Sequence, residues 1–217
     1  ENGFPDPEKA EEEMLSITIK NQTTKKIIVW GIGDYHTDRE DVTYINCSNE
    51  NELLAQFMNF WTKHYPDVIT GWNTEFFDMP FLINRVTKVL GEDRAKEFSP
   101  WGNVTARKVY SHGRDQQVYD IQGVSNLDYL QVYKKFTYTA QESYRLDHIA
   151  FVELGEKKNE NPYDTFKDWY TKDYQSFIDY NIVDVELVDR LEDKMKLLEL
   201  LFTMANEAKV YYDDVFG

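Results

Sequence analysis

The sequence passes directly from a short apolar strand into an apolar helix, and this junction constrains the fold more than any other feature. It lies in the stretch TGWNTEFFDMPFLINRV, residues 70–86. The preceding DVITGWN is typical of a short buried strand, and Leu82 and Val86 then recur on one face of a helix that Gly91 should end. A buried strand that leads straight into a buried helix indicates an α/β domain. An acidic residue, Asp78, lies where the helix begins.

Strand and helix patterns alternate irregularly along the rest of the chain. Alternation and apolar runs predict strands, and apolar residues at helical spacing predict helices. We expect strands at 14–20, 25–33, 42–46 and 67–73, a β-hairpin at 106–123 with its polar tip SHGRD at 111–115, and helices near 49–66, 78–91, 125–136, 143–155 and over most of 165–210. The order resembles an α/β ribonuclease-H-like mixed sheet, in which an antiparallel meander is followed by helix-separated strands. Helices should flank this sheet, with an inserted β-hairpin and a helical C-terminal region.

Composition limits the kind of protein. The chain has 217 residues, 41% of them hydrophobic, and lacks a Gly- or Pro-rich linker, so we expect residues 1–217 to form a single domain with a sizeable core. The single cysteine, Cys47, indicates a reducing compartment. We find neither a membrane-length apolar run nor a signal pattern, which predicts a soluble intracellular protein with no membrane partner. The net charge of −15 argues against DNA binding through a basic surface, but it is compatible with an acidic metal site.

Two short patterns could carry chemistry. Asp78 could simply cap its helix, because Asp is a favoured N-cap residue. In SFIDYNIVDVELV, residues 176–188, Tyr180 and Asp184 lie four apart and therefore share one helix face. They could be a buried tyrosine bonded to an aspartate, or a metal-ligand carboxylate beside a phenol that orients an attacking water. Either pattern alone is weak evidence.

Together the two stretches resemble the Exo II and Exo III motifs of the DEDD exonuclease superfamily, and specifically the 3′-5′ proofreading exonuclease domain of family B DNA polymerases of T4-like bacteriophages. Asn73, Phe77 and Asp78 match N-x-x-x-F-D, and Tyr180 and Asp184 match Y-x-x-x-D. The stretches GFPDP, LDYLQVYKKFTYTAQESYRLDHIA and YNIVDVELV extend the resemblance over nearly the whole chain. The tyrosine in the last motif identifies the tyrosine type, DEDDy.

The resemblance implies metal-dependent hydrolysis of the 3′-terminal phosphodiester of DNA with two Mg²⁺ (or Mn²⁺) ions. It implies that Asp184 holds the metal on the nucleophile side, that Asp78 contributes ligation on the other side, and that Tyr180 orients the attacking water. All three would be catalytic residues, and Asp78 and Asp184 the metal ligands.

The same resemblance implies a DNA-contacting set. Phe4 would stack on the unpaired terminal base, although a turn phenylalanine pinned to the core is an equal alternative. Asn73 and Phe77 belong to the Exo II pattern. Arg107 and Arg114 of the hairpin could meet phosphates, and the alternative is a solvated hairpin.

One motif of the family is missing. Its D-x-E motif, Exo I, precedes a GFP turn, which here is Gly3–Phe4–Pro5, so we expect Exo I just upstream of Glu1. Three internal candidates are rejected, because they lie in a turn, a loop and a hairpin arm: residues 6–8, 38–40 and 118–123. We therefore expect little nuclease activity and weak DNA binding from these 217 residues, and no DNA synthesis.

The expected partners are the single-stranded 3′ end of DNA, the rest of a polymerase chain and the replisome proteins of the phage, in the cytoplasm of the infected bacterial host. Two alternatives are a ribonuclease-H-like DNA-binding module that no longer cleaves and a free-standing DEDDy nuclease acting on RNA. Two further acids, Asp128 and Asp147, are interpreted as helix caps rather than as catalytic residues.

Overall fold

The computed structural model describes residues 5–111, 113–156, 163 and 165–215. It divides into two compact units, which are described separately. The first unit contains Met14–Gln56 and Gln141–Lys194, and the second contains Phe4–Glu13, Phe57–Ala140 and Met195–Gly217. In the part of the chain that the structure describes, no helix has the length and apolar content needed to span a bilayer. The expectation of one domain over residues 1–217 stays a prediction.

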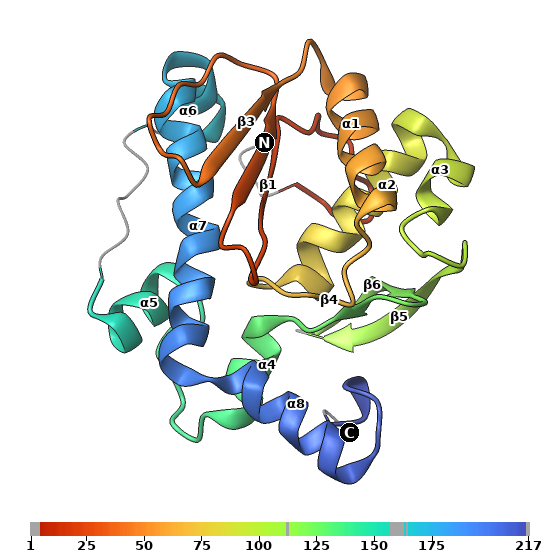
Figure 1. Ribbon diagram of the computed structural model, residues 1–217, viewed down its shortest axis with the longest axis vertical. Coiled ribbons are helices and arrows are strands. Elements are labelled where there is room, and N and C mark those ends of the chain that lie inside the picture. The colour runs from red at the N-terminus through yellow and green to blue at the C-terminus, as the bar shows by residue number, and fades with distance from the viewer. Residues whose placement is uncertain (1–4, 112, 157–162, 164, 216–217) are drawn as a thin grey trace. The chain divides into compact units, whose positions relative to one another are not determined.

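The first unit is built on a mixed three-stranded sheet (Figure 1). Its strands are β1 (Ser16–Lys20), β2 (Ile27–Gly31) and β3 (Val42–Asn46), in the order β1-β2-β3. β2 is central, as its apolar sequence predicts. β1 runs antiparallel to β2, and the turn between them is stabilised by the Asn21 side chain, whose Oδ1 accepts hydrogen bonds from the N–H groups of Thr23 (3.0 Å) and Thr24 (2.9 Å).

The expected antiparallel meander is wrong for the third strand, because β3 runs parallel to β2. Two parallel strands that follow each other in the chain need a connection that returns to the end of the sheet where the first strand began. Here residues 32–41 make that connection, and Tyr35, which is only 6% exposed, packs into the core of the unit. Burial of the Tyr35 ring helps to fix the path of this connection, which the local sequence pattern did not predict.

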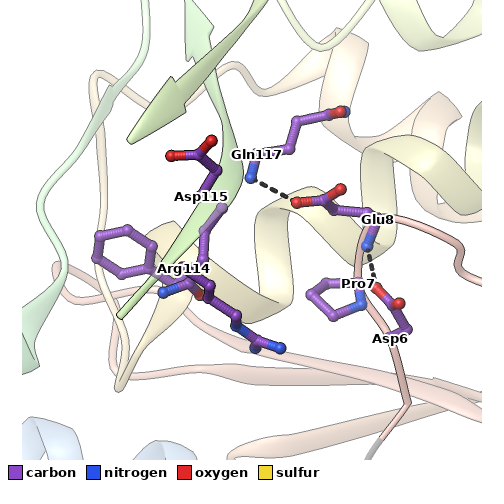
Figure 2. A pocket seen from close by; sticks show the side chains of 8 residues that line it. Asp6, Pro7, Glu8, Arg114, Asp115 and Gln117 are labelled. Atoms are coloured by element: carbon purple, nitrogen blue, oxygen red, sulfur yellow. Dashed lines mark hydrogen bonds between the residues drawn. The ribbon is translucent and has the colours of Figure 1, made fainter. Parts of the chain in front are cut away.

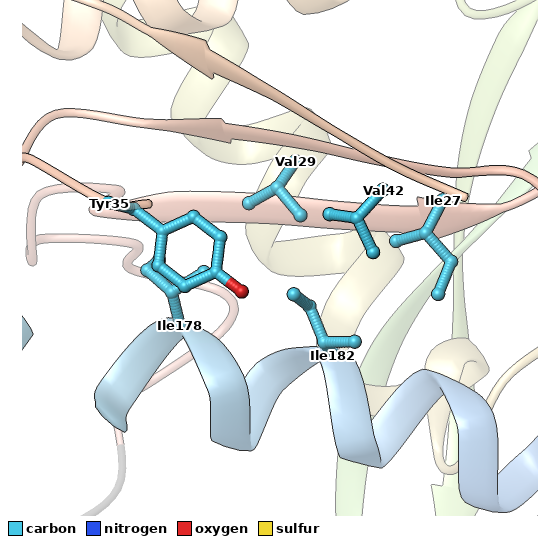
Figure 3. Close-up of a cluster of buried hydrophobic side chains, with 6 residues drawn as sticks. All are labelled: Ile27, Val29, Tyr35, Val42, Ile178 and Ile182. Carbon is cyan, nitrogen blue, oxygen red and sulfur yellow. The ribbon is translucent and has the colours of Figure 1, made fainter. Parts of the chain in front are cut away.

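Among the described residues, the first unit also contains the helices α5 (Leu146–Leu154), α6 (Phe166–Lys172) and α7 (Tyr174–Met195). α7 runs along one face of the sheet (Figure 1). Figure 3 shows Ile178 and Ile182 of α7 pointing at the sheet, where they form one buried cluster with Ile27, Val29, Tyr35 and Val42. The four-residue spacing of Ile178 and Ile182 puts them on the same helix face.

The second unit contains two small sheets. β4 (Val68–Ile69) pairs in parallel with β7 (Ser125–Asn126), and β5 (Val104–Ser111) pairs with β6 (Arg114–Ile121) as an antiparallel hairpin. The hairpin is confirmed where the sequence predicts it, and Gly113 at its tip has the positive φ (80°) that glycine tolerates. His112, in the predicted tip, lies outside the described residues.

Helices surround these strands in the second unit: η1 (Thr74–Asp78, a π-helical turn), α2 (Met79–Leu90), α3 (Glu92–Lys96), α4 (Tyr129–Phe136), α8 (Leu197–Ala208) and η2 (Asp213–Val215). α1 (Glu50–Lys63) begins in the first unit and ends in the second. α2 follows the predicted pattern, with Leu82 and Val86 buried on one face and Gly91 at its C-terminal end with φ 96°.

Candidate active site

The turn that follows β4 carries three of the predicted site residues. Asn73 has a left-handed backbone conformation (φ 68°, ψ 25°), which non-glycine residues adopt rarely but asparagine tolerates. The turn η1 then leads without a break into α2, because the backbone of Asp78 is already helical (φ −64°, ψ −48°). The turn thus places Asn73, Phe77 and Asp78 within a single short segment.

The Asp78 side chain does not act as a helix cap. Asp78 occupies the N-cap position of α2, but its side chain makes no capping hydrogen bond, and the residue is exposed. A capping role as the reason for this acid is therefore wrong, since a cap requires that the carboxylate accept an N–H of the first turn. Phe77, directly before it, stacks on Phe81 of α2 with ring centroids 6.2 Å apart.

Asp128 connects this turn to α4. It is 1% exposed and caps α4 as predicted, with Oδ1 accepting from the N–H of Leu130 at 2.9 Å. The same carboxylate also accepts from the N–H of Asn73 at 2.9 Å and from the N–H of Glu75 at 3.1 Å. Burial raises the pKa of Asp128, although the backbone N–H donors oppose the rise.

The cap prediction for Asp147 is wrong. Arg145 occupies the N-cap position of α5, and Asp147 lies inside the first helical turn. Its carboxylate accepts from the N–H of His148, the next residue, at 2.8 Å. The sequence pattern therefore locates the start of this helix correctly but misplaces the cap.

Arg107, expected to meet phosphate, is bonded to two acids. From β5 it donates to Asp120 Oδ1 (2.9 Å) across the hairpin and to Glu75 Oε1 (3.2 Å) in η1. Burial raises the pKa of Glu75, and the nearby guanidinium opposes that rise. A phosphate would have to compete with these carboxylates for Arg107.

A hollow adjoins the turn and the hairpin in the second unit. The wider part has a volume of about 360 Å³ and is lined by Pro5, Asp6, Pro7, Asn73, Phe76, Phe77, Arg114 and Gln116. An adjoining part, seen in Figure 2, extends along the hairpin to Glu8 and Gln117. There the N–H of Gln117 donates to Glu8 Oε1 at 2.9 Å, which links the chain after Pro7 to β6.

This hollow brings together three predicted DNA-contacting residues, Asn73 and Phe77 from the turn and Arg114 from the hairpin. Its wall combines aromatic faces with one guanidinium, a combination suited to unpaired nucleotides. Phe4, another predicted DNA-contacting residue, lies outside the described residues. The rejected D-P-E triplet contributes Asp6 and Glu8 to the wall.

Tyr180 and Asp184 are half-buried on α7, in the first unit. The Tyr180 ring meets the edge of Trp169 of α6, with centroids 4.7 Å apart and planes at 68°. Trp169 is 3% exposed, and its indole N–H donates to Ser176 Oγ at 2.7 Å. Trp169, itself held by Ser176, therefore packs against the ring of the predicted catalytic tyrosine. Sequence reasoning missed Trp169 because it lies on a different helix.

Asp179, the residue before Tyr180, is hydrogen-bonded to a residue outside the predicted site. Its Oδ1 accepts from the hydroxyl of Tyr35 at 2.8 Å. Burial, together with this hydrogen bond to a carboxylate, raises the pKa of Tyr35 to about 12. Asp179 therefore ties the start of α7 to the segment that follows β2.

The metal prediction depends on Asp78 and Asp184, which belong to different units. Carboxylate oxygens are the donors that Mg²⁺ prefers, so the chemistry of these two residues fits the ion. Within the described ranges, no group of three or more His, Cys, Asp or Glu residues could hold a metal. The association of Asp78 with Asp184 stays a prediction.

Comparison with known proteins defines the class. The family model for the exonuclease domain of family B DNA polymerases matches residues 1–149. The chain belongs to this family, which confirms the ribonuclease-H-like fold expected from its α/β pattern. The family match ends before α7, and so before Tyr180 and Asp184.

Individual relatives extend the match over the whole chain. The chain is 33% identical to the DNA-directed DNA polymerase of Enterobacteria phage T4 over 99% of its own length and 26% of the relative's. It is 31% identical to that of Escherichia phage RB69, over 100% and 27%. The DNA polymerase catalytic subunit of Psittacid herpesvirus 1 is 27% identical over 74% of the chain and 16% of the relative. The chain thus spans about a quarter of the length of the phage polymerases it matches.

Proposed function

We propose that this chain is the 3′-5′ proofreading exonuclease domain of a phage replicative DNA polymerase and that it hydrolyses the 3′-terminal phosphodiester of DNA. The observation that carries the proposal is the hollow lined by Asn73, Phe77 and Arg114, at the turn that ends in Asp78. A pocket that offers two phenylalanines, one arginine and polar groups, next to an exposed carboxylate, suits a nucleotide end beside a hydrolytic centre.

The proposed catalytic residues have separate tasks. Asp78 and Asp184 would ligate Mg²⁺ or Mn²⁺, and such ions, when bound, activate water and neutralise the charge that develops on phosphate oxygens. The Tyr180 hydroxyl would orient the attacking water. Its ring is restrained by Trp169, so the hydroxyl samples few directions, which favours a productive alignment.

The proposed substrate is a single-stranded DNA 3′ end. Its terminal nucleotides would enter the hollow, where Phe77 offers an aromatic contact and Arg114 a partner for phosphate. Asn73 lines the same space and can hydrogen-bond a base or sugar edge. The proposed partners are the other three quarters of a polymerase chain and the phage replisome. The domain would work in the cytoplasm of an infected bacterium, and the two phage relatives support this location.

A digestion assay tests the proposal. A 5′-labelled single-stranded oligonucleotide is incubated in Mg²⁺ or Mn²⁺ with the 217-residue chain and with a longer chain that supplies an upstream D-x-E. Asp184→Ala in the longer chain is the loss variant. Asp193→Ala is the matched control, because Asp193 lies on the same helix, is 55% exposed and pairs only loosely with Lys25 at 3.8 Å.

The proposal expects stepwise shortening from the 3′ end by the longer chain, unchanged by Asp193→Ala and reduced about a thousandfold or more by Asp184→Ala. Cleavage by the 217 residues alone would contradict the predicted metal-ligand set. An inert longer chain that still binds DNA would support the second candidate, a DNA-binding module that no longer cleaves. That candidate is favoured only by the lack of a three-ligand group among the described residues. An RNA oligonucleotide in parallel tests the RNA-nuclease alternative.

A further inference from the structure

We propose that Asp128 is a positioning residue for the exonuclease reaction: its buried carboxylate fixes the turn that presents Asp78. The inference rests on the proposed function for its catalytic consequence, but the structural part can be tested without activity. A helix cap explains the hydrogen bond that Asp128 accepts from Leu130. It does not explain the two bonds that come from the turn.

The carboxylate divides its bonds between two segments of the second unit. Oδ1 accepts from Leu130 in α4 and from Asn73 in the turn, both at 2.9 Å, and Oδ2 accepts from Glu75 at 3.1 Å. At 1% exposure, water cannot replace these bonds easily. Burial of a carboxylate costs free energy unless N–H groups donate hydrogen bonds to it. The turn therefore stabilises the charged Asp128, and Asp128 in turn holds the N–H groups of the turn in place.

The residues on either side of Asp128 add further bonds to the same turn. The Thr74 hydroxyl donates to Asn126 Oδ1 at 2.9 Å, and the Thr70 hydroxyl donates to the Leu127 carbonyl at 2.6 Å. The Tyr129 N–H donates to the Gly71 carbonyl at 2.8 Å. The pairing of β4 with β7 thus continues into the turn through backbone and side-chain hydrogen bonds, and the bonds of Asp128 reach the turn at Asn73 and Glu75.

The conformation of the turn needs such support. Asn73 is left-handed, a conformation that non-glycine residues adopt rarely and that its neighbours must therefore hold in place. The N–H of Phe77 donates to the Asn73 carbonyl at 3.0 Å. The orientation of Asn73 therefore helps to set the position of Phe77, one helical turn later, and of the adjacent Asp78. A shift of about 1 Å in a metal-binding carboxylate is enough to reduce a rate about a hundredfold. Asp128 would act on the reaction only through the turn, as one of the contacts that join residues 126–129 to it.

The first experiment measures amide hydrogen exchange in the 217-residue chain. Asp128→Asn keeps the shape of the side chain but replaces one accepting oxygen by a donor. Asn49→Ala is the control, because Asn49 caps α1 through the N–H of Glu52 at 3.0 Å and has no bond to the turn. We expect Asp128→Asn to speed exchange at Asn73 or Glu75 by about tenfold or more, with β2 amides unchanged, and Asn49→Ala to leave both turn amides as they are. Unchanged exchange at both turn amides would overturn the proposal.

The second experiment measures steady-state excision in the longer chain that carries a D-x-E. We expect Asp128→Asn to lower kcat by about tenfold or more while KM changes by less than about threefold, and Asn49→Ala to leave both near the parental values. Loss of kcat with a matching rise in KM, or no change in kcat, would contradict positioning. If the parent chain does not cleave, the proposed function fails, and the exchange result still decides whether Asp128 holds the turn.

A third variant covers the case in which Asp128→Asn does not fold. Asn126→Ala removes the acceptor of the Thr74 hydroxyl and leaves the cap of α4 intact. We expect faster exchange at Thr74 and a kcat lowered by about threefold or more. An unchanged Thr74 amide and unchanged kcat would show that these contacts do not position the turn, and would overturn the proposal.

Discussion

Asp189 on α7 lies between two lysine side chains of the first unit. Lys20 Nζ is 2.5 Å from Oδ2 and Lys25 Nζ is 2.9 Å from Oδ1, and the Asp189 side chain is only 9% exposed. Burial by itself would raise the pKa of this carboxyl, but the hydrogen bonds from the two lysines lower it to about 2. Because the pKa of an unfolded aspartate is about 3.9, the folded state binds the proton less readily.

The first prediction follows from that difference. The stabilisation should be fully present above about pH 4 and be lost as the pH falls through about 2. Asp189→Asn should lower the free energy of unfolding by about 1–2 kcal/mol at pH 7, measured by urea denaturation, and by much less near pH 2. Asp193→Asn, an exposed neighbour, is the control. An equal decrease in the free energy of unfolding of Asp189→Asn at pH 7 and pH 2 would contradict the ion-pair explanation.

At the scale of elements, α8 ends in a conformation that suits glycine, yet the residue there is a lysine. Lys209 has φ 56° and ψ 46°, and its N–H donates to the Asn206 carbonyl at 3.3 Å while the N–H of Val210 donates to the Ala205 carbonyl at 3.1 Å. Helices commonly end in this left-handed arrangement, which glycine adopts without a Cβ penalty.

The second prediction is that Lys209→Gly raises the free energy of unfolding by about 0.5–1 kcal/mol, because relief of left-handed strain exceeds the added chain entropy of the unfolded state. The measurement is the thermal midpoint with the unfolding enthalpy. Lys209→Ala is the matched comparison, since it removes the same side chain but keeps the Cβ. A glycine variant no more stable than the alanine variant would show that the helix end is not strained.

Local patterns predicted most elements, because strand alternation and helical spacing are properties of neighbouring residues. β3 was placed correctly, Val42–Asn46, but its direction was not, since that depends on the packing of Tyr35 at long range. In the site, the motif resemblance predicts Asp78, Tyr180 and Asp184, and their catalytic roles stay a prediction. The second role of Asp128 could not be predicted, because its bonds to the turn join segments 53 and 55 residues apart.

At the scale of the whole molecule, the net charge limits how tightly the proposed site can hold DNA. The net charge is −15, and Arg107, one of the hairpin cations, is already bonded to Asp120 and Glu75. Binding to phosphate gains its free energy largely from counterions released by free basic groups. A protein with few such groups should therefore hold single strands loosely.

The third prediction is that the 217-residue chain binds a single-stranded oligonucleotide with a dissociation constant weaker than about 1 μM at physiological salt, by fluorescence anisotropy. Arg114→Gln should weaken binding further if Arg114 contacts phosphate from the wall of the hollow. Lys96→Gln is the control, because Lys96 lies on α3 and pairs with Asp93 at 3.1 Å. Binding tighter than about 1 μM would refute the expectation from charge.

The proposed function requires Asp78 and Asp184 to act in the same hydrolytic step, and a double-mutant comparison tests this requirement most directly. Excision rates are measured for the longer chain with Asp78→Ala, with Asp184→Ala and with both. Groups that act together are strongly non-additive, so the double variant should be no slower than the slower single variant, within about threefold. If the fold-decreases of the two single variants multiply in the double variant, the two carboxylates contribute independently, and a shared hydrolytic step is contradicted.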